Sequence, residues 1–357
     1  MAETGGKGVA LAIIDHGRVR YVKAFGVRNS AGDPLRADTV MYGASLTKTL
    51  FAYTVLQLVD QKKLSLDTPL ADYLDKPLPE YGPDPIHPDK YGPYRDLADD
   101  PRWKRITARM ALTHSTGFAN FSFAEPDQKL RIHFDPGTQY SYSGEGMILL
   151  QFVIEHGRKD KGLGLDLGQL TQANFDRLGM IRTSLQWRPD FRPNLAEGFN
   201  DKGEAGPHDE RSKVRVAGSM DTTITDLSKF VAALSRGEGL SAASYSEMLK
   251  PQLHIGTATQ FPNFGPVLPA DRQRKDLFTG LGIIVFDGPQ GAGFYKGGHD
   301  EQTANTMVCI ERLERCVLIL SNDVRMEGGF YQLVRFILGD TGVPYEWEYG
   351  DRAGKSD

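Results

Sequence analysis

Apolar residues gather in short runs near both ends of the chain, with longer helix-like patterns between them. Residues 8–14 and 18–27 are two such runs. Asp15-His16-Gly17 separates them and is a turn signal, so this region predicts a β-hairpin. Strand patterns return late in the chain, at 281–286, 303–310 and 316–321. We therefore expect strands from both ends of the chain.

The middle of the chain has the spacing of helices. Residues 50–59 repeat their apolar positions with helical periodicity, which predicts a helix that ends near 61–63. Further helical patterns lie at 106–114, 145–157, 166–178, 224–235 and 330–338. Proline-rich polar stretches at 77–101 and 251–276 predict long loops, and the tyrosines of the first favour a packed rim.

Strands at both ends with helices between them predict an α+β fold. Hairpin connections favour an antiparallel sheet formed from both chain ends, with flanking helices and an inserted, mainly helical subdomain. We expect a single domain over 1–345, with a sheet part at about 1–45 and 275–345 and a helical part at about 46–274. Residues 346–357 read as a polar tail that frays.

Composition narrows the class of protein. The chain has 357 residues, 25% charged residues and a net charge of −4, so nothing suggests a nucleic-acid partner. Since no run of about 18 apolar residues occurs, we expect no membrane span. The first residues do not form a signal peptide. We expect a soluble protein, either cytoplasmic or periplasmic or secreted with a leader absent from this sequence.

The two cysteines, Cys309 and Cys316, flank a charged turn between two apolar runs. They would face each other across a hairpin, but disulfides there need particular geometry, and we expect two buried reduced thiols. The eight histidines lack H-E-x-x-H spacing, and the chain has no C-x-x-C pair. We therefore expect no metal and no cofactor.

Ser45 and Lys48 stand just before the apolar run 50–59 and lie one helical turn apart, so they share a face. A hydroxyl beside an amine at the positive end of a helix has the chemistry of an activated nucleophile. The same residues fit a capping serine followed by a surface lysine, and S-x-x-K is common by chance. Other segments must decide between these interpretations.

Four further motifs follow along the chain. They are Leu112-Thr113-His114-Ser115-Thr116-Gly117, Pro136-Gly137-Thr138-Gln139-Tyr140-Ser141-Tyr142-Ser143-Gly144, Ala217-Gly218-Ser219-Met220 and, between two predicted strands, Tyr295-Lys296-Gly297-Gly298-His299. With Ser45-Leu46-Thr47-Lys48, they resemble the serine β-lactamase and penicillin-binding-protein superfamily, and within it the class C β-lactamases and family VIII carboxylesterases. The resemblance runs from about residue 8 to residue 323 and implies a β-lactamase/transpeptidase-like fold.

The resemblance also implies roles for individual residues. Ser45 would be the nucleophile of an acyl-enzyme, with Lys48 and Tyr142 as its base. Lys296 and the glycines after it would bind substrate, and the backbone N–H groups of Ser45 and His299 would bind the oxyanion. The substrate-binding and oxyanion set is Lys296, Gly297, Gly298 and His299.

Three other residues are alternative candidates for the catalytic chemistry. Tyr140 is the rival tyrosine, but its place matches a structural aromatic of the family. His114 reads as structural, and the His299 side chain as part of the substrate-facing rim. No G-x-S-x-G occurs, so an α/β-hydrolase elbow is not supported.

Two departures from the family pattern bear on the substrate. Gly144 stands where the family has an asparagine that holds the acylamino group of a substrate. Gly297 stands where K-T-G has a threonine that helps to bind a carboxylate. Both losses tilt the prediction toward ester hydrolysis, although Lys296 keeps one positive charge.

We therefore predict a serine hydrolase that acts on small or medium esters, a carboxylesterase, with a small-molecule ester or amide as its partner. The alternatives are a β-lactamase, a D-amino-acid peptidase or an amidase of the same superfamily. An acyltransferase and a binding homologue without turnover rank below these.

Overall fold

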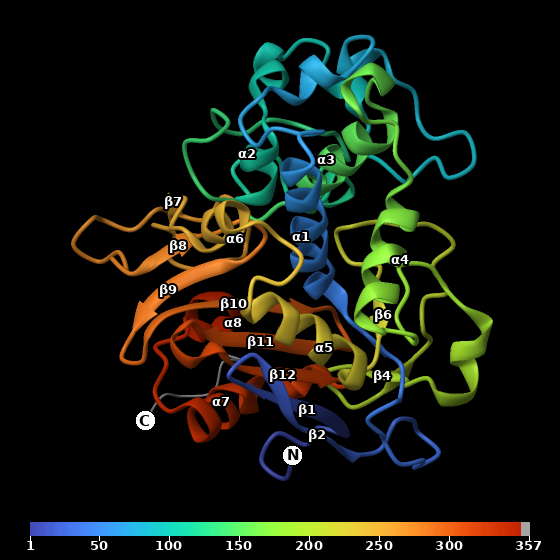
Figure 1. The fold of residues 1–357 in the computed structure, drawn as a ribbon, viewed down its shortest axis with the longest axis vertical. Helices are drawn as coiled ribbons and strands as arrows, with labels where there is room; N and C mark the ends of the chain where they lie inside the picture. The colour runs from blue at the N-terminus through green and yellow to red at the C-terminus, as the bar shows by residue number, and fades with distance from the viewer. Residues whose placement is uncertain (351–357) are drawn as a thin grey trace.

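A computed structural model describes residues 1–350, and its centre is an eight-stranded sheet in the order β2-β1-β12-β11-β10-β9-β8-β7 (Figure 1). All paired neighbours are antiparallel. The strands are β1 (Gly8–Asp15), β2 (Arg18–Gly26), β7 (Leu253–His254), β8 (Leu277–Thr279), β9 (Ile284–Gly288), β10 (Gly291–His299), β11 (Ala304–Ile310) and β12 (Arg315–Ser321). Two small sheets pair β3 (Met41–Tyr42) with β6 (Asp221–Thr222) and β4 (Gly198–Phe199) with β5 (Ala205–Gly206).

The two ends of the chain meet in this sheet. β1 pairs with β12, from Val9 opposite Ser321 to Ile14 opposite Cys316. β11 is buried along its whole length and β12 almost so, as expected for strands that are covered on both faces. The predicted α+β fold, with an antiparallel sheet formed from both chain ends, is confirmed.

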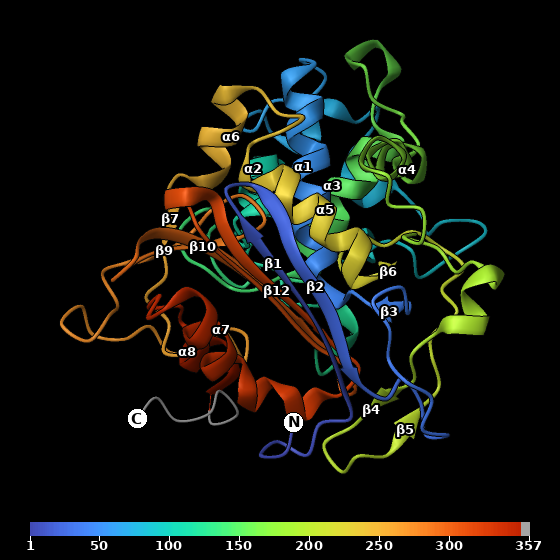
Figure 2. The same cartoon turned by 60° about the horizontal axis from the view of Figure 1, so that its bottom comes forward.

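Helices cover both faces of the sheet. α5 (Ile224–Ser235) packs on β1 and β12, and α1 (Thr47–Asp60) lies on the same side. α7 (Phe330–Leu338) and α8 (Tyr345–Tyr349) lie on the opposite side, as Figure 2 shows. The site described below is therefore bordered by elements from both sides of the sheet.

The predicted central helices are all present. They are α2 (Ala108–Leu112), α3 (Gly144–His156), α4 (Leu167–Leu178) and α5. Each helix is preceded by an N-cap residue whose side chain accepts a hydrogen bond from a backbone N–H of the first turn. These N-cap residues are Thr107, Ser143, Asp166 and Thr223, respectively. α6 (Ala242–Leu249) was not predicted, because its short stretch of small residues has little apolar periodicity.

The proline-rich stretch 77–101 contains only short 3₁₀ turns, yet it is packed. Tyr91 and Tyr94 are buried, and their ring centroids lie 5.1 Å and 4.9 Å from that of Phe152 on α3. Aromatic contacts of this kind hold a loop in place without backbone ladders. The predicted packed rim agrees with this arrangement.

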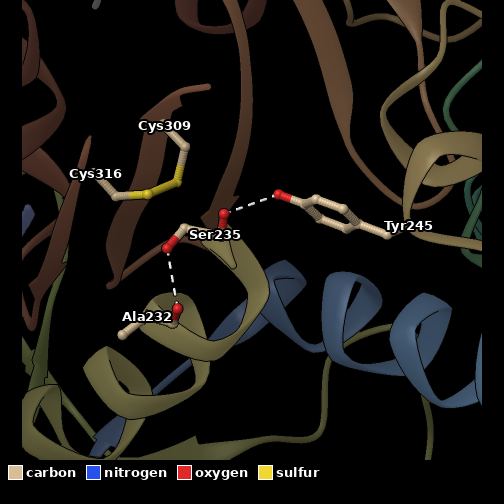
Figure 3. The surroundings of a disulfide bond; sticks show 5 residues. All are labelled: Ala232, Ser235, Tyr245, Cys309 and Cys316. Carbon is tan, nitrogen blue, oxygen red and sulfur yellow. Dashed lines mark hydrogen bonds between the residues drawn. A yellow bond between two sulfur atoms is a disulfide. The ribbon is translucent and has the colours of Figure 1, made fainter. Parts of the chain in front are cut away.

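The expectation of two reduced thiols is wrong, because the structure joins Cys309 and Cys316 in a disulfide (Figure 3). The two residues are direct partners in the β11–β12 register, and their Cα atoms lie 4.1 Å apart. The hairpin register therefore supplies the proximity that the sequence left open. Beside the bond, the hydroxyl of Tyr245 donates to the carbonyl of Ser235 at the end of α5.

The expectation of a frayed tail after residue 345 is wrong for its first residues. Residues 345–349 form α8, where Trp347 and Tyr349 are buried against the core that covers one face of the sheet. Residues 351–357 of the predicted tail lie outside the described residues. Within residues 1–350, no helix has both the length and the apolar character needed to cross a membrane.

Candidate active site

The serine of the S-x-x-K motif lies in a short 3₁₀ turn, Ala44–Leu46, that leads into α1. Ala44 has a φ of +46°, a conformation that non-glycine residues adopt rarely and that often marks a functional turn. Ser45 does not cap α1, whose N-cap is Leu46. Instead, Ser45 Oγ accepts a hydrogen bond from Lys48 Nζ at 3.0 Å. The interpretation as a capping serine with a surface lysine is therefore wrong.

Lys48 is 1% exposed, so its amine is shielded from water. Besides Ser45, it donates to the carbonyl oxygen of Ala217 and lies 4.9 Å from the centre of the Tyr142 ring. Burial lowers the pKa of Lys48, and the charge of Lys296 lowers it further, although Tyr142 acts in the opposite direction. A lowered pKa favours the neutral amine, which is the form able to accept a proton.

Tyr142 reaches the site from the segment just before α3. Its Oη accepts a hydrogen bond from Lys296 Nζ at 3.4 Å. Burial raises the pKa of Tyr142, but the charges of Lys296 and Lys48 and side-chain hydrogen bonds with Ser45 and Lys48 outweigh it and bring the pKa to about 8. Tyr142 is thus a phenol with an accessible phenolate form, and it interacts with both lysines.

Two neighbours hold Tyr142, one at its ring and one at its backbone. The His114 ring lies against the Tyr142 ring, with centroids 4.4 Å apart and planes tilted by 33°, and burial holds the pKa of His114 well below 6.5, so the imidazole is neutral. Asn263 Nδ2 donates to the Tyr142 carbonyl oxygen at 2.6 Å. The rival, Tyr140, donates its hydroxyl to Gln260 at 2.9 Å, and burial raises its pKa well above 10. These contacts agree with a structural role for His114 and Tyr140.

Lys296, Gly297, Gly298 and His299 belong to strand β10 itself, rather than to a connection between strands. Lys296 is 4% exposed, and its Nζ donates to the carbonyl oxygen of Gly297 at 2.6 Å as well as to Tyr142. β10 packs directly on the nucleophile turn, because a Cβ at Gly298 would lie 3.0 Å from the backbone nitrogen of Ser45. A glycine is needed for this close approach. His299 Nδ1 lies 3.4 Å from Glu327 Oε1.

At both positions where the chain departs from the family pattern, another side chain fills the vacated space. A Cβ at Gly144 would lie 2.6 Å from the ring of Phe121. The backbone N–H of Gly144 donates to Asn120 Oδ1 at 3.0 Å. Both Phe121 and Asn120 line the pocket in front of Ser45. The room for an asparagine side chain at 144 is therefore taken by an aromatic ring.

The second vacated space holds a carboxyl group. A Cβ at Gly297 would lie 2.0 Å from Oε1 of Glu348, which comes from α8. Glu348 is 6% exposed and lines the pocket together with Lys296. Sequence reasoning missed Glu348, because it placed the residue in a polar tail. The close sequence of Tyr345, Trp347 and Tyr349 was the available signal that this segment is buried.

The pocket has a volume of about 500 Å³ and mixes apolar and charged walls. Asp89 comes from the first proline-rich stretch, and Gln260 and Phe261 come from the second, so both predicted loops shape it. A third segment, 209–219, also lines the pocket and carries Arg211 and Arg215. Such a cavity suits a small organic molecule.

A serine bonded to a buried lysine, a tyrosine beside both, and an antiparallel sheet strand along the crevice define the class of serine β-lactamases and penicillin-binding-protein-like proteins. The chain belongs to the Beta-lactamase family, whose pattern it matches over residues 1–336.

Individual relatives are more distant. The chain is 27% identical, over 303 residues, to the probable fimbrial assembly protein FimD, serogroup H1, of Dichelobacter nodosus, and the match covers 77% of this chain and 70% of that protein. It is 29% identical over 224 residues to the lovastatin esterase of Penicillium rubens, covering 56% and 53%. The fold is similar to that of the octameric penicillin-binding protein homologue from Pyrococcus abyssi, with a TM-score of 0.70, 20% identity, and coverage of 97% of this chain and 76% of that one.

Proposed function

We propose that this protein is a carboxylesterase that hydrolyses small or medium esters through an acyl-enzyme on Ser45. The observation that carries the proposal is the contact of Ser45 Oγ with Lys48 Nζ at 3.0 Å, beside a Tyr142 that also contacts Lys296. The group sits in a pocket of about 500 Å³, which suits a small ester.

Acylation begins with attack of Ser45 Oγ on the ester carbonyl carbon. A serine hydroxyl is a poor nucleophile until a neighbour accepts its proton, and Lys48 and Tyr142 together accept it. Their lowered pKa values make this transfer accessible near neutral pH. The alkoxide leaving group then takes a proton from the same pair as the ester C–O bond breaks.

The developing oxyanion needs preorganised donors. The backbone N–H groups of Ser45 and His299 fit this role, since β10 packs on the nucleophile turn. A water molecule then attacks the acyl-enzyme, gives a proton to the Lys48–Tyr142 pair and releases the carboxylic acid. Ser45 recovers its proton, so the cycle closes without a cofactor.

Two substitutions support an ester over a β-lactam. Phe121 and Glu348 fill the spaces left at Gly144 and Gly297, so side-chain contacts to an acylamino group and to a carboxylate are both absent there. An ester needs neither contact for its hydrolysis. The lovastatin esterase among the relatives agrees with this preference.

The test is a panel of p-nitrophenyl butyrate, nitrocefin and a D-alanyl amide, measured as kcat/KM on the wild type and on Ser45→Ala. We expect the butyrate ester to be the best substrate and Ser45→Ala to lose at least about 10³-fold. A fluorophosphonate probe should label Ser45. Full ester activity in Ser45→Ala would overturn the mechanism. A higher kcat/KM for nitrocefin or the amide would assign a β-lactamase or amidase instead, and no labelling would indicate a protein without turnover.

A further inference from the structure

Glu348 is a buried acid that the proposed chemistry does not use. It stands in the wall of the pocket with Lys296 and Gly297, and 6% of its surface is exposed. Acidic side chains are almost never this buried unless they have a partner or a function. Its position therefore needs an explanation in terms of the site.

The carboxyl group occupies space that only a glycine leaves open. A Cβ at position 297 would lie 2.0 Å from Glu348 Oε1 and 2.5 Å from Cδ. Any other residue at 297 would displace the carboxyl group. Gly297 and Glu348 thus form a pair in which the small residue makes room for the acidic one.

The helix that carries Glu348 is fastened to the pocket loop. The backbone N–H of Gln260 donates to the Trp347 carbonyl oxygen at 2.8 Å, and Gln260 Nε2 lies 3.5 Å from Glu348 Oε1. Trp347 Nε1 donates to Thr257 Oγ1 at 3.2 Å. These bonds hold the carboxyl group in one place, as specificity-determining groups require.

The charge of the Glu348 side chain depends on its surroundings. Burial raises the pKa of Glu348 to about 6, and the nearby charge of Lys296 opposes the rise. At pH 7.5 the group is therefore mainly a carboxylate. It supplies, from the protein itself, the negative charge that a free acid on a substrate would otherwise bring to Lys296.

We propose that Glu348 is a specificity-determining residue, whose carboxylate takes the place of a substrate carboxylate beside Lys296 and makes the pocket select uncharged esters over esters that carry a free acid. The proposal rests on ester hydrolysis at Ser45. Its physical basis is that a second negative group in this buried wall would meet like charge at short range and would find the space occupied.

The test uses two acetate esters of equal shape, 3-acetoxybenzamide and 3-acetoxybenzoate, which differ only in charge. The ratio of their kcat/KM values is measured at pH 7.5 for the wild type, Glu348→Gln and Glu346→Gln. Glu346 is the matched control, because it lies on the same helix and is exposed. We expect Glu348→Gln to lower the amide-to-acid ratio at least about tenfold, through a gain on the acid, and Glu346→Gln to leave the ratio unchanged.

A binding arm separates this proposal from the proposed function. Calorimetry of the two phenol products, 3-hydroxybenzamide and 3-hydroxybenzoate, needs no turnover. Glu348→Gln should bind the carboxylate about tenfold more tightly relative to the amide than the wild type does. An unchanged ratio in Glu348→Gln, in rates or in binding, overturns the role of Glu348. Absence of Ser45-dependent hydrolysis of any ester, together with the expected change in binding, overturns the esterase function alone.

Discussion

The two lysines of the pocket stand in contrasting surroundings. Lys48 contacts a hydroxyl, a backbone carbonyl and an aromatic ring, and burial together with the charge of Lys296 lowers its pKa, although Tyr142 opposes this shift. Lys296 shares its wall with the buried carboxyl group of Glu348. The roles that we propose for the two lysines differ accordingly. An amine whose pKa is lowered by burial is suited to moving a proton, whereas a cation in the same pocket wall as an acid is suited to recognition.

Replacing each lysine tests this contrast most strongly. Lys48→Met removes the amine beside Ser45, and we expect kcat/KM for p-nitrophenyl butyrate to fall by about 10³-fold or more. Lys296→Met removes a charge that lowers the pKa of Tyr142 and of Lys48 without a hydrogen bond to Ser45, so we expect a smaller loss of about tenfold. Equal losses of kcat/KM in the two variants, with circular dichroism that matches the wild type, would show that the two lysines do not have different roles.

A further loss of activity is expected when Tyr142 is replaced. Tyr142→Phe removes the phenol, and we expect a loss of about 10²-fold in kcat/KM for a neutral ester. In the wild type kcat/KM should rise with pH through an apparent pKa near 8, because the deprotonated form of the Tyr142–Lys48 pair accepts the serine proton. Tyr142→Phe should lose or move this step.

Tyr140→Phe is the matched control, because Tyr140 is an equally buried tyrosine whose hydroxyl bonds to Gln260 instead. Its variant should keep the step near pH 8. A profile that persists unchanged in Tyr142→Phe would assign the titration to another group.

The packing of Gly297 against Glu348 in the pocket wall can also be tested. Gly297→Ala places a methyl group 2.0 Å from Glu348 Oε1, and overpacking of this kind costs about 1–3 kcal/mol of unfolding free energy. Glu348→Ala in the same chain removes this clash and leaves the one with Tyr349 Oη, which would lie 2.6 Å from the new Cβ. In urea unfolding, the double variant should therefore be less destabilised than the sum of the single variants. Additive effects would show that the two positions do not compete for space.

The smallest expected effect concerns stability and pH. Burial raises the pKa of Glu348 from 4.5 to about 6, so the folded protein prefers the neutral acid. Stability from this group is full below pH 4.5 and declines as pH rises through 6, by about 2 kcal/mol in total. Glu348→Gln does not titrate, so its advantage over the wild type should grow across this range and then level off.

Urea unfolding at several pH values measures this difference. The groups around Glu348 are Lys296 and several tyrosines whose pKa values lie above 10: Tyr140, Tyr295, Tyr345 and Tyr349. These tyrosines do not titrate in this window. A pH-independent difference would place the Glu348 pKa near its ordinary value.

Most elements could be predicted from sequence, because their apolar positions carry the period of the structure. The strands of residues 8–14 and 316–321 and the helix at 224–235 are examples, with bounds within a residue or two of the structure. β10 was read as a connection, since Gly291, Gly293 and the pair at 297–298 have low strand propensity. Its neighbours β9 and β11 impose the strand by pairing with it on both sides.

The residues of the candidate site also differ in how far the sequence predicts them. Ser45, Lys48, Tyr142 and Lys296 carry motifs, and the structure brings all four together. Glu348 belongs to no motif, and its place depends on α8 docking against the loop that carries Gln260. Contacts between segments this far apart follow from packing, which local sequence patterns do not contain.

The pairing of β1 with β12 has a consequence for the order in which the protein matures. During synthesis β1 emerges before its partner strand, Arg315–Ser321, which is made only after the central helices and strands β7 to β11. Until then the apolar side chains of β1 lack half of their sheet, and β10 has no completed sheet from which to close the crevice over Ser45. The proposed site at Ser45 can therefore form only once β12 has been made, and the growing chain passes through a long interval in which an unpaired strand is open to misassociation.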